Sequence, residues 1–189
     1  MTGAAGSPIG VLEALRRRRM HRYFDPSPLD EETLRTLAWA ATRAPAGGNQ
    51  PSRFLLVVSD PRLVKTVVEV TPSYIGTLPA AIIAILTDLD SAETYMGTQG
   101  REQLSRIDAG AAAENIALAA VELDVGCYLF RSSNEAALRA VLELPPAVRV
   151  EWLAAVGRPA ATPSPAPRAP RQVVYVDRWG GEQWEAQRP

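Results

Sequence analysis

The sequence predicts an α/β or α+β fold with a central sheet, and two observations carry that prediction. Stretches with helical periodicity alternate with short apolar runs of strand length along the chain. The runs at 54–58 and 80–86 are apolar throughout, which is typical of strands buried on both faces. A length of 189 residues is enough for one domain with a sizeable core.

Five stretches have the apolar spacing of helices: 8–20, 30–44, 60–70, 107–123 and 132–142. Asp30 is a suitable N-cap for the second of these helices. That helix should end near Ala44, because Pro45 disfavours a helical conformation in the residue before it. The helix at 107–123 is rich in alanine, so its slim surface predicts close packing against the sheet or a second subunit.

Strands are expected at 54–58, 80–86, 127–130, 148–156 and 173–175. Residues 89–105 are polar and contain two glycines, so they predict either a loop or a short helical insertion, and such segments often serve as lids. Residues 157–170 contain five prolines and predict an extended arm. The expected organisation is a disordered N-terminus at 1–7, a single domain at 8–157 and an arm with a C-terminal segment at 158–189.

Composition narrows the classes of function. A net charge of −1 argues against general nucleic-acid binding, which needs a basic surplus. The single cysteine, Cys127, cannot form an intramolecular disulfide and fits a reducing compartment. The N-terminus lacks a signal-peptide pattern, and no apolar run reaches the ~18 residues that span a bilayer. We therefore expect a cytoplasmic protein with no nucleic-acid or membrane partner.

The motif content excludes several chemistries. His21 is the only histidine and has no metal-ligand spacing around it, so no metal site is expected. No nucleophile elbow, Walker loop or Gly-x-Gly-x-x-Gly motif is present. What remains is a set of arginines, a Gly/Asn-rich loop and apolar walls. These suit an aromatic, phosphorylated cofactor that brings its own reactivity, with no catalytic side chain.

The most distinctive stretch is 16–24, which reads Arg-Arg-Arg-Arg-Met-His-Arg-Tyr-Phe. Arg18 and Arg22 are four residues apart, so they share one face if the first helix continues through them. Converging guanidinium groups there would suit a phosphate or another planar anion. The alternative interpretation is a solvated helix end or an unstructured basic arm.

Several ordered motifs resemble the nitroreductase family of FMN-dependent oxidoreductases over about residues 9–179. Residues 18–24 resemble its Arg-Arg-Ser-x-Arg-x-Phe opening, and 44–51, followed by Phe54, resemble its Ala-Pro-Ser-x-x-Asn-x-Gln-Pro-Trp loop. Residues 108–120 resemble its long central helix, and the run from Val156 to Trp179 resembles its C-terminal segment. The length and tail are similar to a compact branch that includes the cyclodipeptide oxidase catalytic subunit.

The resemblance implies an α+β fold, a three-layer α-β-α sandwich around a central, mostly antiparallel sheet. It implies that residues 8–157 form one FMN-binding domain. It also implies an intertwined homodimer in which the C-terminal arm at 158–189 is exchanged and two subunits share each flavin.

The resemblance also implies a set of cofactor-binding residues: Arg18, Arg19, Met20, Arg22, Asn49, Gln50, Cys127, Tyr128, Leu129, Phe130 and Arg168. The first two arginines would hold the FMN phosphate or ribityl end, and Arg168 would close over the phosphate. Arg22 would lie at the pyrimidine edge of the flavin, where a cation stabilises the charge that develops on reduction. Asn49 and Gln50 would hydrogen-bond the ring edge above an apolar floor made by 127–130.

The implied activity is transfer of a hydride from NAD(P)H to FMN and then to a nitroaromatic, quinone or similar flat acceptor, by a ping-pong mechanism. One alternative is a cyclodipeptide oxidase-like flavin enzyme that acts on a peptide-like natural product, with a small partner subunit. Another is a protein that sequesters flavin without turnover. Met20 and Ser52 motivate this last alternative, because they replace the usual serine and tryptophan.

Overall fold

The computed structural model describes residues 9–49, 51–160 and 173–184. A four-stranded antiparallel sheet of order β1-β2-β4-β3 lies at its centre. Its strands are β1 (Arg53–Val58), β2 (Ala81–Asp88), β3 (Gly126–Phe130) and β4 (Val148–Gly157). The helices are α1 (Val11–Arg17), α2 (Glu31–Thr42), α3 (Pro61–Val70), α4 (Leu89–Gln99), α5 (Ser105–Glu122) and α6 (Glu135–Val141), with helical turns η1 (Gly47–Asn49) and η2 (Gly100–Leu104).

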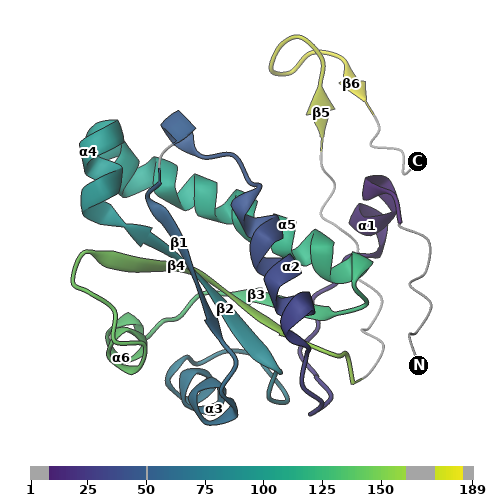
Figure 1. Cartoon of the computed structure of the whole chain (residues 1–189). Coiled ribbons are helices and arrows are strands. Elements are labelled where there is room, and N and C mark those ends of the chain that lie inside the picture. The colour runs from purple at the N-terminus through teal and green to yellow at the C-terminus, as the bar shows by residue number, and fades with distance from the viewer. Residues whose placement is uncertain (1–8, 50, 161–172, 185–189) are drawn as a thin grey trace.

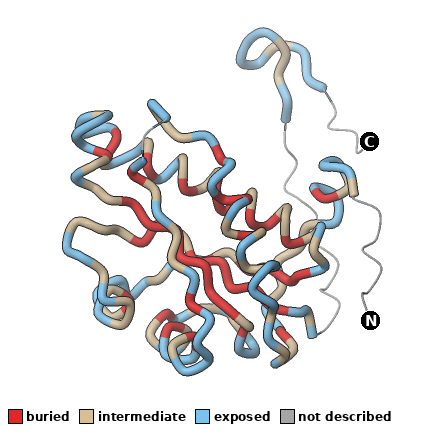
Figure 2. Tube along the Cα trace, viewed as in Figure 1, coloured by how far each residue is buried: buried red, intermediate tan, exposed pale blue. Residues whose placement is uncertain are grey.

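The elements form three layers (Figure 1). Helices α2 and α5 pack on one face of the sheet, and α3 and α6 pack on the other. Strand β2 is buried on both faces, as its apolar sequence predicts: Ile83 and Ile85 join the α2/α5 core, and Ile82 joins the α3/α6 core. Figure 2 shows the buried residues concentrated along the central strands and α5. The expected α+β sandwich is confirmed.

Strand β1 is less buried than its apolar sequence predicts. Residues 54–58 were expected to be buried on both faces, yet Phe54 is 50% exposed and Val57 is 37% exposed. The reason is that β1 lies at the edge of the sheet and pairs with β2 alone. An apolar run gives the length of a strand but not its place in the sheet.

Helix α5 packs closely because its buried face is built from alanine. Ala109, Ala112 and Ala113 are fully or almost fully buried against the sheet and α2. The Asn115 side chain donates a hydrogen bond to the Ala40 carbonyl of α2 at 3.0 Å. The prediction of a long, slim helix at 107–123 is therefore confirmed, and within the subunit that helix joins the sheet to α2.

The segment at 89–105 is helical, so the loop alternative is wrong. Asp88 caps α4 by accepting hydrogen bonds from the Asp90 and Ser91 amides, each at 3.0 Å. Gly97 interrupts the helix with a positive φ of 62°. The turn η2 then joins α4 to α5.

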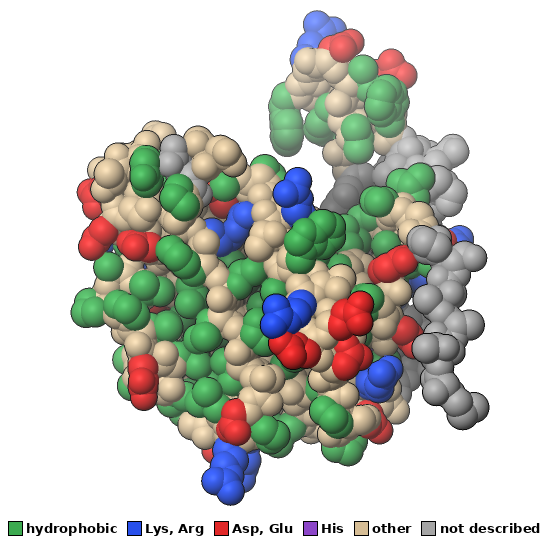
Figure 3. Space-filling model, in the orientation of Figure 1, with side chains coloured by type: hydrophobic (Ala, Val, Ile, Leu, Met, Phe, Trp, Pro, Cys, Tyr) green, Lys and Arg blue, Asp and Glu red, His purple; other side chains and the backbone are tan. Residues whose placement is uncertain are grey.

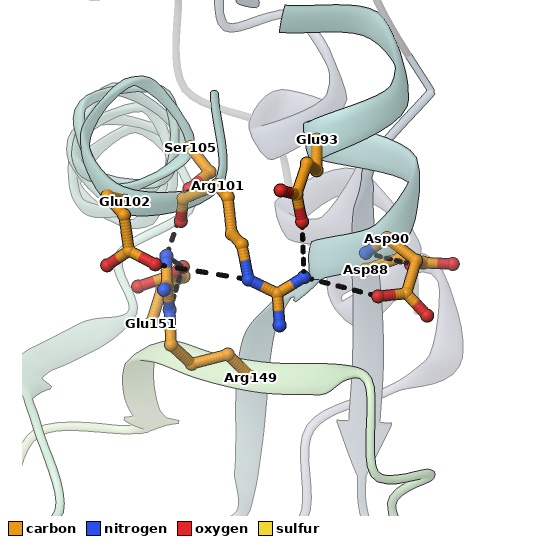
Figure 4. A network of polar contacts seen from close by, with 8 residues as sticks. All are labelled: Asp88, Asp90, Glu93, Arg101, Glu102, Ser105, Arg149 and Glu151. Atoms are coloured by element: carbon orange, nitrogen blue, oxygen red, sulfur yellow. Dashed lines mark hydrogen bonds and ion pairs between the residues drawn. The ribbon is translucent and has the colours of Figure 1, made fainter. Parts of the chain in front are cut away.

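A β-bulge in β4 brings a buried ion pair to the start of α5 (Figure 4). Ile85 is opposite Trp152 and Leu86 is opposite Val150, so Glu151 has no partner across the sheet. The Glu151 side chain is 1% exposed, and the Arg149 guanidinium pairs with it at 2.6 Å. Arg149 also donates to the Ser105 hydroxyl at 2.9 Å, which ties β4 to α5.

The C-terminal residues form a separate hairpin, β5 (Val174–Tyr175) with β6 (Gln183–Trp184), which stands clear of the sandwich in Figure 1. The strand expected at 173–175 thus pairs within its own segment. Residues 1–7 and most of the proline-rich arm lie outside the described residues. Among the helices that are described, none combines the length and apolarity that a bilayer span requires.

The buried pair gives a prediction about stability. Glu151→Leu leaves the Arg149 charge buried without its partner, so the free energy of unfolding should fall by about 3 kcal/mol. The double variant Arg149→Met/Glu151→Leu should recover most of that loss, because no charge is left buried. Urea unfolding at fixed protein concentration measures both.

The matched control is Glu31→Gln, which breaks the exposed Glu31–Arg35 pair of α2. It should change the free energy of unfolding by less than about 0.5 kcal/mol. A loss of that same small size for Glu151→Leu would show that the buried pair does not stabilise the junction between β4 and α5.

Candidate functional site

The arginine-bearing segment leaves α1 and runs along the outer edge of β3. Arg18 adopts φ −51° and ψ 128°, which ends the helix at Arg17. The His21 amide then donates to the Cys127 carbonyl of β3 at 2.9 Å, and the Asp25 amide donates to the Arg158 carbonyl at 2.8 Å. The expectation of a helix through residue 20 is therefore wrong, because backbone hydrogen bonds to the end of the sheet replace those of a helix.

Two glycines allow this close approach. A Cβ atom at Gly126 of β3 would lie 3.0 Å from the His21 Cβ. On the other side of the segment, a Cβ atom at Gly76 would lie within 2.3 Å of the Tyr23 ring, and the Gly76 amide donates to the Arg22 carbonyl at 2.7 Å. The segment is therefore fixed between β3 and the loop that precedes β2.

Arg18 faces the α5 layer. Its Nε lies 3.2 Å from Oε1 of Glu114, and the Arg18 side chain is 30% exposed. Arg19 bends back and donates from Nη1 to the Arg16 and Arg18 carbonyls, both at 2.8 Å, which satisfies the end of α1. Sequence reasoning did not assign Glu114 a role in the site, although a carboxylate in an alanine-rich helix was a signal that could have found it.

Arg22 contacts the other side of the sheet. Its guanidinium carbon lies 4.9 Å from the centre of the Tyr128 ring, a cation–π contact. The Tyr128 ring is stacked on Phe130, with centroids 5.5 Å apart, and both rings belong to the α3/α6 core. Met20 packs against this same core. Arg18 and Arg22 therefore do not share a helix face, because the chain between them is extended.

The predicted floor at 127–130 is a strand, so its side chains alternate between two faces. Cys127 and Leu129 pack with the α2/α5 core, while Tyr128 and Phe130 pack with the α3/α6 core. One flat ring cannot lie on all four side chains. Each face has a guanidinium of the predicted site nearby: Arg22 lies over Tyr128, and the charge of Arg18 acts on Cys127.

The predicted Asn49 loop lies at the start of α5. The Gly47 amide donates to Oδ2 of Asp108 at 2.7 Å, and the Asn49 amide donates to the Ala46 carbonyl at 2.9 Å. Asn49 is exposed with φ 53°, a left-handed conformation that asparagine tolerates better than most residues. Asp108 precedes Glu114 by six residues of α5, about 9 Å along the helix axis. The loop and Arg18 are thus held at two points of one helix.

Arg53 was not predicted to be part of the site, yet its side chain fixes the base of the Asn49 loop. Its guanidinium donates to three backbone carbonyls, those of Ala44, Pro45 and Asp108. Burial lowers the pKa of Arg53, and the charge of Asp108 opposes that shift. Gln50 and Arg168, two further predicted cofactor residues, lie outside the described part of the chain.

His21 supplies no cation to this region at neutral pH. Burial lowers its pKa from the usual value, and the nearby Asp124 only partly opposes the shift. In the ranges that the structure describes, no group of three or more His, Cys, Asp and Glu side chains is placed to hold a metal ion. The charges that an anion could meet here therefore come from arginines.

A family model matches most of this chain. The nitroreductase family model matches residues 15–73 and 70–158, which include the arginine segment, the Asn49 loop and β3. The chain belongs to the nitroreductase family. Of the motifs that suggested this family from the sequence, the arginine segment lies along β3 and the Asn49 loop lies at the start of α5, while part of the C-terminal motif is outside the described residues.

Solved structures have the same nitroreductase fold. A protein from Desulfovibrio desulfuricans, assigned as a nitroreductase and crystallised in complex with FMN, is 28% identical, and the match covers 86% of this chain and 94% of that chain with a TM-score of 0.73. A nitroreductase family protein from Streptococcus pneumoniae is 21% identical, with 85% and 96% covered and a TM-score of 0.71. A protein from Parabacteroides distasonis, assigned as an NADH dehydrogenase/NAD(P)H nitroreductase, is 20% identical, with 89% and 98% covered and a TM-score of 0.76.

The buried thiol of β3 gives a prediction about reactivity. Burial raises the pKa of Cys127 to about 12, so only about one thiol in ten thousand is ionised at pH 8. An aromatic disulfide reagent should label the folded protein at least about a hundredfold more slowly than the urea-unfolded protein. Labelling at similar rates in both states would show that the thiol is accessible to the reagent and would contradict the burial of Cys127 in β3.

Proposed function

We propose that the protein is an FMN-dependent oxidoreductase that oxidises NAD(P)H and reduces a nitroaromatic, quinone or similar flat acceptor in a ping-pong cycle. Membership of the nitroreductase family supports this proposal, as does the FMN in the Desulfovibrio desulfuricans structure. The observation that carries it is the arginine segment fixed by backbone hydrogen bonds along β3. A segment held in this way presents its guanidinium groups at defined positions, which an anionic cofactor requires.

The arginines suit the two charged regions of FMN. Arg18, partly exposed beside Glu114, would bind the phosphate or ribityl end together with Arg19. Arg22, exposed above Tyr128, would lie at the pyrimidine edge of the flavin. FMN, when bound, supplies a ring that accepts and donates hydride. Arg22 would stabilise the negative charge that reduction places on that edge.

The family resemblance implies the remaining cofactor contacts. Asn49 is exposed at the tip of its loop and would hydrogen-bond the ring edge. We propose that Gln50 and Arg168 have the roles that the family resemblance implies, at the ring edge and over the phosphate. The strand 127–130 would contact the flavin mainly through Tyr128, whose ring makes the cation–π contact with Arg22.

We propose that the active form is a homodimer in which the C-terminal arm is exchanged. Large apolar side chains are exposed on α1, where Val11 is 70% exposed, and on α5, where Ile107 is 66% exposed. Trp179 of the C-terminal hairpin is 90% exposed, and Figure 3 shows hydrophobic side chains gathered on this hairpin, clear of the body. Exposed apolar surface on this scale is typical of an interface, and a second copy of the chain would cover it.

Met20 favours the alternative in which the protein binds flavin without turnover. It packs its side chain into the α3/α6 core, so it offers the cofactor no hydroxyl where the family has serine. A protein that binds flavin without turnover would tolerate this change. Steady-state oxidation of NAD(P)H with an added quinone would reject the binding-only alternative. Reduction of the bound flavin by cyclic dipeptides, and not by NAD(P)H, would instead favour the cyclodipeptide oxidase-like branch.

Flavin titrations separate the roles of the two arginines. Arg18→Met should weaken FMN binding about tenfold and leave riboflavin binding unchanged, because riboflavin has no phosphate for the lost charge-assisted hydrogen bonds to hold. Arg22→Met should weaken both ligands and slow flavin reduction by NAD(P)H, since the charge at the pyrimidine edge is lost. Quenching of flavin fluorescence measures affinity, and anaerobic stopped flow measures reduction.

The control for these titrations is Arg35→Met, which removes an exposed guanidinium of α2 and should change neither quantity. Wild-type protein that stays colourless after FMN is added would overturn the proposed function. Equal weakening of FMN and riboflavin by Arg18→Met would instead remove only the assignment of Arg18 to the phosphate.

The dimer can be tested through the hairpin. Wild-type protein should have twice the chain mass of 20.4 kDa by light scattering. Because large aromatic side chains often dominate interface affinity, Trp179→Ser/Trp184→Ser should weaken association at least about tenfold. Dilution series of both proteins measure the change. A wild-type protein that is monomeric at all concentrations would contradict the proposed exchange.

A further inference from the structure

The Gly47–Asn49 loop is held by a guanidinium that donates its hydrogen bonds to backbone carbonyls at the base of the loop. Arg53, the first residue of β1, points its planar fork at three carbonyl oxygens. Nη2 donates to Ala44 at 3.0 Å, and Nη1 donates to Pro45 at 3.2 Å and to Asp108 at 3.0 Å. One side chain therefore joins three segments: the residues after α2, the start of α5 and β1.

Asp108 completes the arrangement from α5. Its backbone carbonyl accepts from Arg53, and its carboxylate accepts from the Gly47 amide at 2.7 Å. Met96 of α4 also packs close to Gly47, since a Cβ atom at Gly47 would lie 2.8 Å from the Met96 sulfur. The first residue of η1 is thus fixed by a hydrogen bond to Asp108 and by close packing against Met96. Asn49 follows two residues later.

The position of Arg53 also suits the electrostatics of a helix end. The Ala44 and Pro45 carbonyls lie just past the end of α2 at Thr42, and a cation is favoured near a helix C-terminus by the helix dipole. Arg53 donates to both carbonyls and places its charge near that end of the helix. A lysine ammonium is a point charge and cannot reproduce the planar fork, so charge alone would not preserve the geometry.

We propose that Arg53 and Asp108 are positioning residues, which set the place of Asn49 and thereby its hydrogen bond to the flavin ring. This inference rests on the proposed function, because it takes Asn49 as a ligand of the flavin. Arg53 acts through the loop and does not touch the cofactor itself. Arg53 donates to Ala44 and Pro45, which precede η1, and to Asp108. Asp108 in turn accepts from the Gly47 amide of η1.

A double-mutant cycle between Arg53 and Asn49 tests this inference. Asn49→Gly removes the side-chain amide and keeps a residue that tolerates φ 53°. Arg53→Lys should weaken FMN binding about fivefold in the wild-type background, which corresponds to one lost hydrogen bond. In the Asn49→Gly background it should have almost no effect, because residues that act through one another are not additive.

Asp108 offers a conservative pair of variants for the same experiment. Asp108→Asn keeps an oxygen that accepts from the Gly47 amide, so FMN affinity should stay within about twofold of the wild type. Asp108→Ala removes that acceptor and should weaken FMN binding about fivefold. Riboflavin should follow FMN in every variant, since the loop is expected to contact the ring and not the phosphate.

Hydrogen exchange of cofactor-free protein gives a readout that needs no flavin. Arg53→Lys and Asp108→Ala should speed exchange at residues 44–49 and leave the strands unchanged, whereas the control Arg62→Lys, on the exposed start of α3, should change neither loop exchange nor FMN affinity. Equal weakening by Arg53→Lys in both backgrounds, or unchanged loop exchange, would overturn the inference. Wild-type protein without a flavin spectrum would instead overturn the proposed function.

Discussion

The close packing of the alanine face of α5 against the sheet and α2 is the constraint on which the rest of the molecule depends. Small side chains let the helix approach its neighbours, and the polar residues left on it then reach different elements. Ser105 meets β4, Asp108 holds the Gly47 loop, Glu114 pairs with Arg18 and Asn115 joins α2. A bulkier helix would move all four partners at once, so core packing and site geometry are set together.

The second element of the site is the segment after α1, whose backbone forms hydrogen bonds with the sheet in place of helical ones. Past Arg17 the backbone extends and pairs with β3 and with the end of β4. As a result Arg18 contacts the α5 layer, while Arg22 contacts a ring of the opposite layer. The two guanidinium groups therefore lie on different faces of the sheet edge, and we propose that they bind separate parts of one cofactor.

Much of the fold could be predicted from the sequence, because its signals are local. Asp30 caps α2 as expected, and the apolar run at 80–86 forms most of β2, which is buried from Ala81 to Thr87. The nitroreductase family was identified from ordered motifs. The exposure of Phe54 could not be predicted, because an edge strand and a central strand can have the same composition. Arg53 was missed for a related reason, since its partners are backbone carbonyls, which no sequence motif marks.

The sequence by itself determined most of the helices and strands of the sandwich, the arginine segment and the family, since periodicity, capping residues and motifs are properties of neighbouring residues. Only the tertiary structure decided which face each guanidinium contacts and which residues hold the Asn49 loop. Those features depend on contacts between residues far apart in the chain, such as His21 with Cys127 and Arg53 with Asp108. The physical reason is that strand register, a β-bulge and close helix packing fix such contacts, and none of these is encoded within a single stretch of sequence.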